Sequence, residues 1–182
     1  MSVELKAVDD RPQKGDIYRR IHAWGLACGE VNPLGTFAVV VNEVGELAEA
    51  VDWGDEENIR LETGDVAFAV AVLYDVGHRA GLIVDDEVPG INEIYDLSTA
   101  DCSPTEFLMA LRDLGESIVK PKKQADFGVC CGALFAMAAK MAKVHDNDFE
   151  RDCLLPVIER NERRLATGKS IAGVFVKEEG LQ

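Results

Sequence analysis

Four acidic residues form two pairs with the same spacing. Glu43 and Glu46 are three residues apart, and so are Glu62 and Asp65. In an α-helix this spacing places both carboxylates of a pair on one face, about 4.5 Å apart along the axis. Two like charges about 5 Å apart repel by roughly 3 kcal/mol at an effective dielectric of about 20. Because carboxylate oxygens suit Mg²⁺ and Mn²⁺, the two pairs predict a site for a divalent cation.

The residues around the two pairs predict that the pairs face each other. Apolar runs at 37–41 and 66–70 place both pairs in helices that contribute to a core. Between them, the turn sequence Asp-Trp-Gly-Asp at 52–55 lets the second helix fold back antiparallel to the first. The four carboxylates would then meet across one helix–helix seam. The alternative is a charged outer stripe on two amphipathic helices.

The rest of the chain predicts an all-α fold, with a four-helix-bundle-like core of antiparallel helical hairpins. Thr36 is the expected N-cap of the second helix, and Ser103-Pro104 begins the fourth. No segment alternates at period two for long enough to build a sheet. We expect a linker over 82–102 with a short helical piece at 91–97, and a short extended C-terminal tail. The expected helices cover 16–28, 36–53, 57–78, 103–119, 125–144 and 148–165.

A weaker internal repeat follows the acidic motif. The pattern of 42–46, acids three apart around a glycine, recurs at 112–116, and 126–129 resembles 62–65 except that Val129 replaces the last acid. If the repeat is real, one all-α domain over 1–182 holds a complete unit (1–81) and an incomplete one (103–182). The hairpin 103–144 would then pack against the hairpin 36–78 as a built-in partner that helps to enclose the acids. Chance similarity of short helical hairpins is the alternative.

Composition restricts the partners and the compartment. A net charge of −14 and a pI near 4.6 argue against binding to nucleic acids or anionic membranes, and an anionic substrate would need a metal or a local basic group. Five cysteines without a zinc-type spacing indicate small buried residues in a reducing compartment. The N-terminus lacks the apolar core of a signal peptide, and no uncharged apolar stretch is long enough to span a bilayer. We therefore expect a cytoplasmic protein.

The segments 43–50 and 62–66 together resemble the ExxE…ExxD signature of MazG-like, all-α nucleoside triphosphate pyrophosphohydrolases, and 161–164 and 168–178 resemble the ending of phage-type members. The resemblance implies a bundle completed by dimerisation or higher homo-oligomerisation, and cleavage of an NTP or dNTP to the monophosphate and pyrophosphate. It carries over to Mg²⁺ (or Mn²⁺) ligands Glu43, Glu46, Glu62 and Asp65, with Glu43 and Glu46 also catalytic. Many family members have Glu where this chain has Asn42. Because an amide cannot take a proton, water activation would have to come from the ion site or from Glu46.

Further substrate-binding residues are expected outside the acidic motif. Trp53 and His22 resemble base- and nucleotide-contacting residues of dCTP-pyrophosphatase-type members, and an indole suits base stacking. Packing of Trp53 at the hairpin corner and an ordinary helix histidine are the alternatives. Arg163 and Lys169, with neighbouring Arg164, could hold phosphates, although basic residues also favour helix C-termini.

Two other function classes are open. A non-catalytic helical module that binds nucleotide or a protein partner would fit the incomplete second unit and Asn42. A redox di-iron bundle is disfavoured, because such sites use Glu-x-x-His and none of the four acids has His three residues on. The sequence does not indicate which base or sugar is preferred.

Overall fold

The computed structural model describes residues 14–29, 32–83, 102–120 and 124–167 of the chain. These residues form six α-helices and one π-helical segment, and none of them forms a strand. The all-α prediction is therefore confirmed. The expected helical piece at 91–97 and the tail lie outside the described residues. The elements are α1 (Lys14–Cys28), α2 (Pro33–Trp53), α3 (Glu56–Arg79), α4 (Pro104–Val119), α5 (Gln124–Val144), η2 (Phe149–Leu154) and α6 (Leu155–Ala166).

The hairpin α2–α3 is fixed by its caps and its turn. Asn32, not Thr36, is the N-cap of α2: its side chain accepts a hydrogen bond from the Leu34 amide at 3.2 Å. The prediction of Thr36 was wrong because Asn32 followed by proline provides both an Asx acceptor and a fixed first helical residue one turn earlier. Gly54 ends α2 with a left-handed backbone (φ 67°), and the next residue, Asp55, caps α3. The antiparallel hairpin is as predicted.

The second hairpin, α4–α5, lies against the first. Ser103 caps α4 as predicted, accepting from the Glu106 amide at 3.4 Å. Helix α4 packs on α2 and α5 packs on α3, so the predicted contact between the two hairpins is confirmed. Phe107 and Leu114 of α4 are buried in this contact layer.

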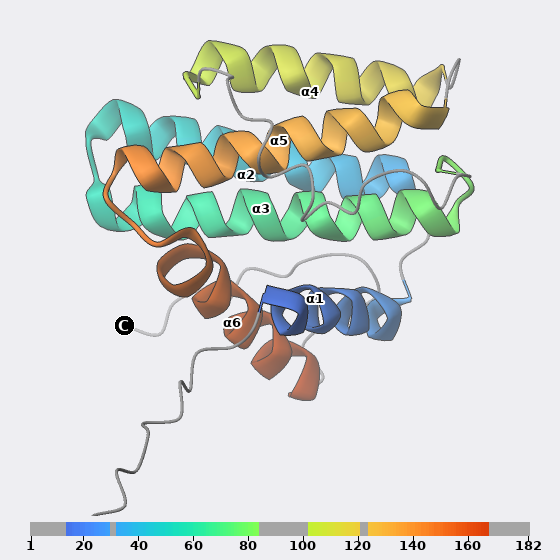
Figure 1. Cartoon of the computed structure of the whole chain (residues 1–182), viewed down its shortest axis with the longest axis horizontal. Coiled ribbons are helices and arrows are strands. Elements are labelled where there is room, and N and C mark those ends of the chain that lie inside the picture. Colours follow the sequence, from blue (N-terminus) through green and yellow to red (C-terminus); the bar gives the residue numbers. More distant parts are fainter. Residues whose placement is uncertain (1–13, 30–31, 84–101, 121–123, 168–182) are drawn as a thin grey trace, which may run out of the picture.

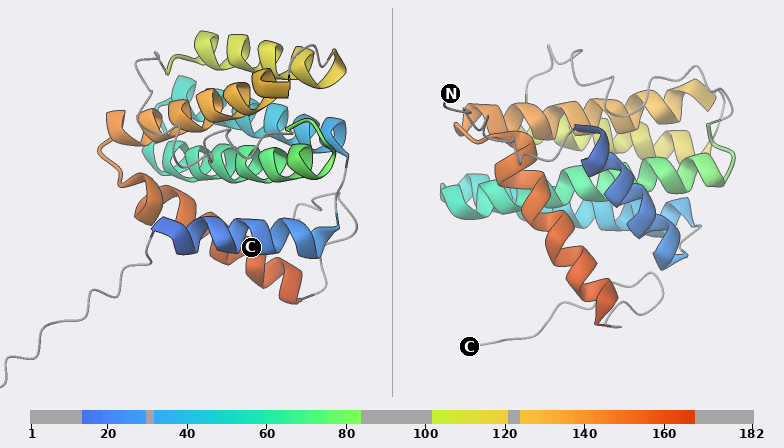
Figure 2. Two further views of the ribbon diagram at one scale, coloured as in Figure 1. Left: turned by 45° about the vertical axis from the view of Figure 1, so that its right-hand side comes forward. Right: turned by 60° about the horizontal axis from the view of Figure 1, so that its bottom comes forward.

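A third layer, formed by α1, η2 and α6, covers the other side of α3. Figures 1 and 2 show α1 and α6 crossing this side, opposite α4. The expected single helix over 148–165 instead begins with the π-helical turn η2, capped by Asp148. Pro156 has no N–H to donate to the Asp152 carbonyl, and the Arg60 side chain of α3 donates to that carbonyl at 3.0 Å. The tertiary contact thus stabilises a backbone that helical periodicity does not predict.

Helix α5 contains a long apolar stretch. One window in the described residues, 127–144, is long and apolar enough to cross a membrane, but 61% of it is buried inside the molecule. Here it serves as a core helix, with Leu134 and Phe135 fully enclosed. The five cysteines are free thiols, and Cys102, Cys131 and Cys153 are buried, as expected for small core residues.

Candidate active site

Three of the four predicted acidic residues converge at the α2–α3 seam. Glu43 comes from α2, and Glu62 and Asp65 come from α3. Each offers a carboxylate oxygen, and these oxygens lie within 4.8 Å of one another. All three side chains are half-buried. The antiparallel hairpin thus brings together charges that would separate if nothing positive lay between them.

Glu46 lies beside this group rather than within it. It lines the same cavity, but its Oε1 accepts a hydrogen bond at 3.0 Å from Nδ2 of Asn42, one turn earlier on α2. The structure therefore gathers all four predicted acids around one space. It sets three of them close together and holds the fourth by a neighbouring amide.

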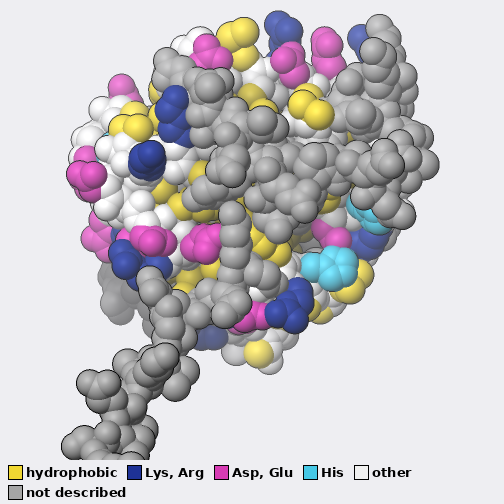
Figure 3. Space-filling model, viewed as in Figure 1, with side chains coloured by type: hydrophobic (Ala, Val, Ile, Leu, Met, Phe, Trp, Pro, Cys, Tyr) yellow, Lys and Arg dark blue, Asp and Glu magenta, His cyan; other side chains and the backbone are white. Residues whose placement is uncertain are grey.

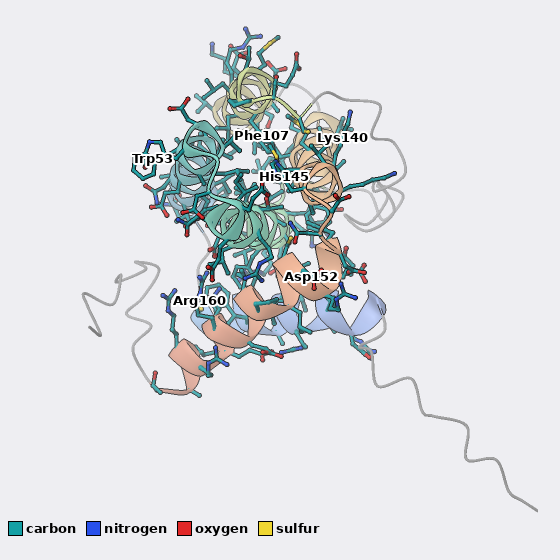
Figure 4. All side chains as sticks on the ribbon, turned by 90° about the vertical axis from the view of Figure 1, so that its left-hand side faces the viewer. Trp53, Phe107, Lys140, His145, Asp152 and Arg160 are labelled. Carbon is teal, nitrogen blue, oxygen red and sulfur yellow. The ribbon has the colours of Figure 1, made fainter. Side chains whose placement is uncertain are left out.

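That space is a cavity of about 380 Å³ between α2, α3 and α6. Its polar wall is the acidic face of α2–α3, and its apolar part comes from Val39, Phe68 and Ala69. The facing wall is α6, which contributes Arg160, Asn161 and Arg164. Figure 4 shows Arg160 between α6 and the α2–α3 hairpin. The cavity therefore has carboxylates on one side and guanidinium groups on the other.

Helix α6 and η2 can approach α3 closely because residue 64 is glycine. A Cβ at Gly64 would lie 2.2 Å from the Cys153 carbonyl oxygen and 2.9 Å from a Val157 methyl group. Gly64 stands between Glu62 and Asp65, so the close approach occurs at the acidic motif itself. A Cβ at Gly45, in the other pair, would meet nothing within 4 Å. Of the two glycines within the acidic pairs, only Gly64 is explained by close helix packing.

The electrostatics of the cavity are incompletely balanced. Burial, followed by the charges of Asp65, Glu46 and Glu62, raises the pKa of Glu43 to about 7. Burial also raises the pKa of Asp65, although Arg160, which donates a hydrogen bond to it, opposes the rise. The positive charge near these carboxyl groups therefore does not offset the effect of burial on their pKa. An all-oxygen donor set with excess negative charge fits a hard divalent cation such as Mg²⁺.

The other predicted site residues lie elsewhere. His22 on α1 pairs with Asp75, which also accepts a hydrogen bond from Arg79, and none of these three lines the cavity. Trp53 is 71% exposed and projects outward from the end of α2. Arg163 is on α6 but does not line the cavity, and Lys169 lies outside the described residues.

Sequence reasoning named Arg164 as a possible phosphate-binding residue but missed Arg160, the other arginine of this wall. Arg160 and Arg164 are four residues apart and therefore share a helix face. That spacing could have indicated a pair directed at one site, whereas Arg163 points elsewhere. Asn161 is 2% exposed, and its buried Oδ1 accepts no hydrogen bond from the described residues. Its own backbone carbonyl accepts from Trp24 Nε1 at 3.1 Å, which anchors this turn of α6 to α1.

Comparison with known proteins agrees with the site. Residues 32–90 match the family model described as the MazG nucleotide pyrophosphohydrolase domain. No curated protein and no solved structure matches the chain. The matched stretch holds α2, α3 and the whole acidic motif, and α4, α5 and α6 lie beyond it. Over residues 32–90, the stretch that carries the acidic motif is therefore similar to a MazG nucleotide pyrophosphohydrolase domain.

Proposed function

We propose that this protein is a Mg²⁺-dependent pyrophosphohydrolase that cleaves an NTP or dNTP between the α and β phosphates. The observation that carries the proposal is the cavity in which the acidic motif of the MazG domain faces two arginines of α6. A triphosphate is polyanionic, so it can enter an acidic protein only where cations balance its charge. The two walls together would provide that balance.

Glu43, Glu62 and Asp65 would hold Mg²⁺, or Mn²⁺ in its place, with Glu46 as the fourth acid. When bound, the ion would neutralise phosphate charge and favour ionisation of a nearby water. Arg160 and Arg164 would bind the β and γ phosphates with charge-assisted hydrogen bonds. Lys169, beyond the described residues, remains a further candidate for this role, as does Arg163 from the outer side of α6.

The apolar part of the cavity would receive the base or sugar. Phe68 and Ala69 form this part together with Val39, and the Asn161 amide is the buried polar group beside them. An amide offers both a donor and an acceptor, so it can hydrogen-bond to a base edge. Trp53 and His22 do not line the cavity, so they would not contact a base bound in it.

Glu46 is the residue best placed to take the proton from the attacking water. The Asn42 amide donates a hydrogen bond to its Oε1 and so orients the carboxylate at the edge of the cavity, where a carboxylate can serve as a general base. The water oxygen would form a bond to the α phosphorus as the bond from that phosphorus to the α–β bridging oxygen breaks. The proton would pass to the Glu46 carboxylate, and pyrophosphate would leave from the side of Arg160 and Arg164.

A second copy of the chain is the partner we propose. The outer face of α2 exposes Leu34 (51%) and Val41 (43%), with Ala38 and Gly45 also exposed along the same stripe. Helix pairing over such small and apolar residues would produce a homodimer or a higher homo-oligomer. Figure 3 shows one face of the molecule, on which the basic side chains of the described residues are scattered and form no large basic patch. Sedimentation equilibrium of the wild type and of Val41→Glu tests the dimer.

Release of pyrophosphate from a panel of NTPs and dNTPs, with Mg²⁺ and with Mn²⁺, tests the activity. We expect turnover of at least one nucleotide, and its loss in Glu46→Gln and in Asp65→Asn. A panel without turnover, or full activity in both variants, would contradict the proposal. Thermal stabilisation by a nucleotide without pyrophosphate release would instead indicate a non-catalytic binding module, which the amide at Asn42 favours.

A further inference from the structure

Two nitrogens of the Arg160 guanidinium differ in their hydrogen bonding. One terminal nitrogen, Nη2, donates to Oδ1 of Asp65, and these two side chains are 33% and 14% exposed. The Nε of the same guanidinium is buried and has no hydrogen-bond partner among the described residues. Burying an N–H of a cation without an acceptor is unfavourable. The side chain is thus only partly satisfied in the position it occupies.

In the proposed function, Asp65 would interact with two cations, the divalent metal ion and the guanidinium of Arg160. It belongs to the group of three carboxylates suited to a divalent ion, and it is also the partner of Arg160. A divalent ion at these oxygens and a guanidinium on the same carboxylate would repel each other in a part-buried site. Arg160 therefore weakens binding of the ion for as long as it remains on Asp65.

A polyphosphate would remove this conflict. Arg160 lines the cavity together with Arg164, and phosphate oxygens suit the planar donor set of a guanidinium. Moving from Asp65 to a phosphate would also give the buried Nε an acceptor. The same movement would leave the Asp65 carboxylate to the ion.

We propose that Arg160 is shared between Asp65 and the polyphosphate, so that binding of the divalent cation and binding of the nucleotide are coupled through this side chain. The inference rests on the proposed function of the cavity but adds a property to it. The cation is bound weakly in the absence of nucleotide, and the arginine that weakens it becomes a phosphate ligand.

The test is the Mn²⁺ affinity of the full chain, measured by electron paramagnetic resonance without nucleotide. We expect Arg160→Gln to bind Mn²⁺ about tenfold more tightly than the wild type, within the usual range of coupling between sites. The same variant should bind a nucleotide analogue with a methylene bridge between the α and β phosphates about tenfold more weakly, measured without metal. Tighter Mn²⁺ binding together with weaker nucleotide binding would show that Arg160 acts on both ligands. If Arg160 only bound phosphate, the nucleotide affinity alone would change.

Matched variants control for charge and folding. Arg151→Gln removes the same charge from η2, where Arg151 is exposed and pairs with Asp152, and should change neither affinity. Arg160→Lys, which keeps the charge on a shorter side chain, should shift both affinities in the same directions by less. Circular dichroism verifies folding, so that either folded Arg160 variant decides the question.

Unchanged Mn²⁺ affinity in the folded Arg160 variants would overturn the inference. If the wild type still releases pyrophosphate in that case, the proposed function stands without the coupling. A wild type that neither binds Mn²⁺ nor releases pyrophosphate would refute both.

Discussion

The hairpins α2–α3 and α4–α5 carry related acidic patterns, yet among the described residues only the first gathers its acids around a cavity. In α4, Asp113 is 55% exposed and pairs with its neighbour Arg112, and Glu116 is also exposed. The position on α5 that corresponds to the fourth acid is Val129, which is 61% exposed. Acids at i, i+3 therefore become a cluster only where a facing helix supplies a second pair and another element covers the seam.

The covering element is not the one that the repeat suggested. Helix α4 packs on α2, on the side opposite α1 and α6 (Figure 2), and α5 packs on α3, where its Phe135 also contacts Tyr18 of α1 and Phe149 of η2. Within the described part of the chain, the cavity is lined only by α2, α3 and α6. The expectation that the second hairpin encloses the acids is therefore wrong. Its apolar faces are used for core packing, which requires the acids to lie on the other side of the first hairpin.

The largest expected difference between the hairpins is in activity. Glu62→Gln should reduce pyrophosphate release by about 10³-fold or more, because charge stabilisation by a bound metal amounts to several kcal/mol and each 1.4 kcal/mol is tenfold. The matched change Glu116→Gln, on the exposed face of α4, should have no effect. Steady-state release with Mg²⁺ measures both variants. Equal losses would mean that the two acidic patterns are functionally equivalent.

The next largest effect is on the free energy of unfolding and depends on how closely another element packs against each hairpin. Gly64→Ala would place a Cβ 2.2 Å from a backbone carbonyl oxygen of η2, so α6 and α3 must separate. We expect a loss of about 3 kcal/mol in the free energy of unfolding, at the upper end of ordinary overpacking. In α4, a Cβ at Gly115 would lie 3.0 Å from the tip of the Phe37 ring, which is half-buried and can shift.

Urea denaturation compares these glycine variants. Gly115→Ala should change stability by less than about 1 kcal/mol, because the gain in helix propensity offsets the small shift. Gly45→Ala, which faces open space, should gain about 0.5 kcal/mol or more. A Gly64→Ala variant as stable as Gly45→Ala would contradict the close contact between α3 and η2.

The same comparison shows what the sequence could predict. Helical periodicity and cap residues predicted the helices of both hairpins, since these depend on neighbours a few residues apart. The four acids were predicted for the same reason, because a tight turn at Gly54 leaves one way to fold α3 back on α2. Arg160 and Asn161 were missed because they meet the acids only through long-range packing of α6. That packing depends on the missing side chain of Gly64 and on the bond from Arg60 to the π-helical turn, and neither leaves a local pattern.

A smaller effect should appear in the pH dependence of stability without metal. The pKa of Glu43 is raised from 4.5 to about 7, so the folded state holds this proton more strongly than the unfolded chain. Its contribution to stability is therefore fully present below pH 4.5 and is lost as the pH rises to about 7. The loss is at most about 3 kcal/mol, and about 1–2 kcal/mol after allowance for the exposed part of the side chain.

Urea midpoints in EDTA between pH 4.5 and 8 measure this loss. Glu43→Gln should flatten the profile, whereas Asp113→Asn, in the exposed acidic pattern, should leave it unchanged. Saturating Mg²⁺ should reverse the trend, because the ion binds the deprotonated carboxylate. A wild-type profile in EDTA that rises from pH 4.5 to 7 would contradict the raised pKa.

The smallest expected effect separates stability from function in the two hairpins. Ser103→Ala removes the cap of α4, a hydrogen bond of 3.4 Å, and Asp55→Ala removes the cap of α3, where two carboxylate oxygens accept from Asn58. Each should cost about 1 kcal/mol, and Asp55→Ala slightly more. Of these two helices, only α3 carries proposed ligands, so fraying of its first turn can reach Glu62, whereas fraying of α4 has no direct route to a carboxylate of the cavity. Mn²⁺ affinity should therefore be unchanged in Ser103→Ala and reduced in Asp55→Ala. Equal reductions in the two variants would show that the second hairpin, although it lines no part of the cavity, holds the acidic residues in place through its packing against α2.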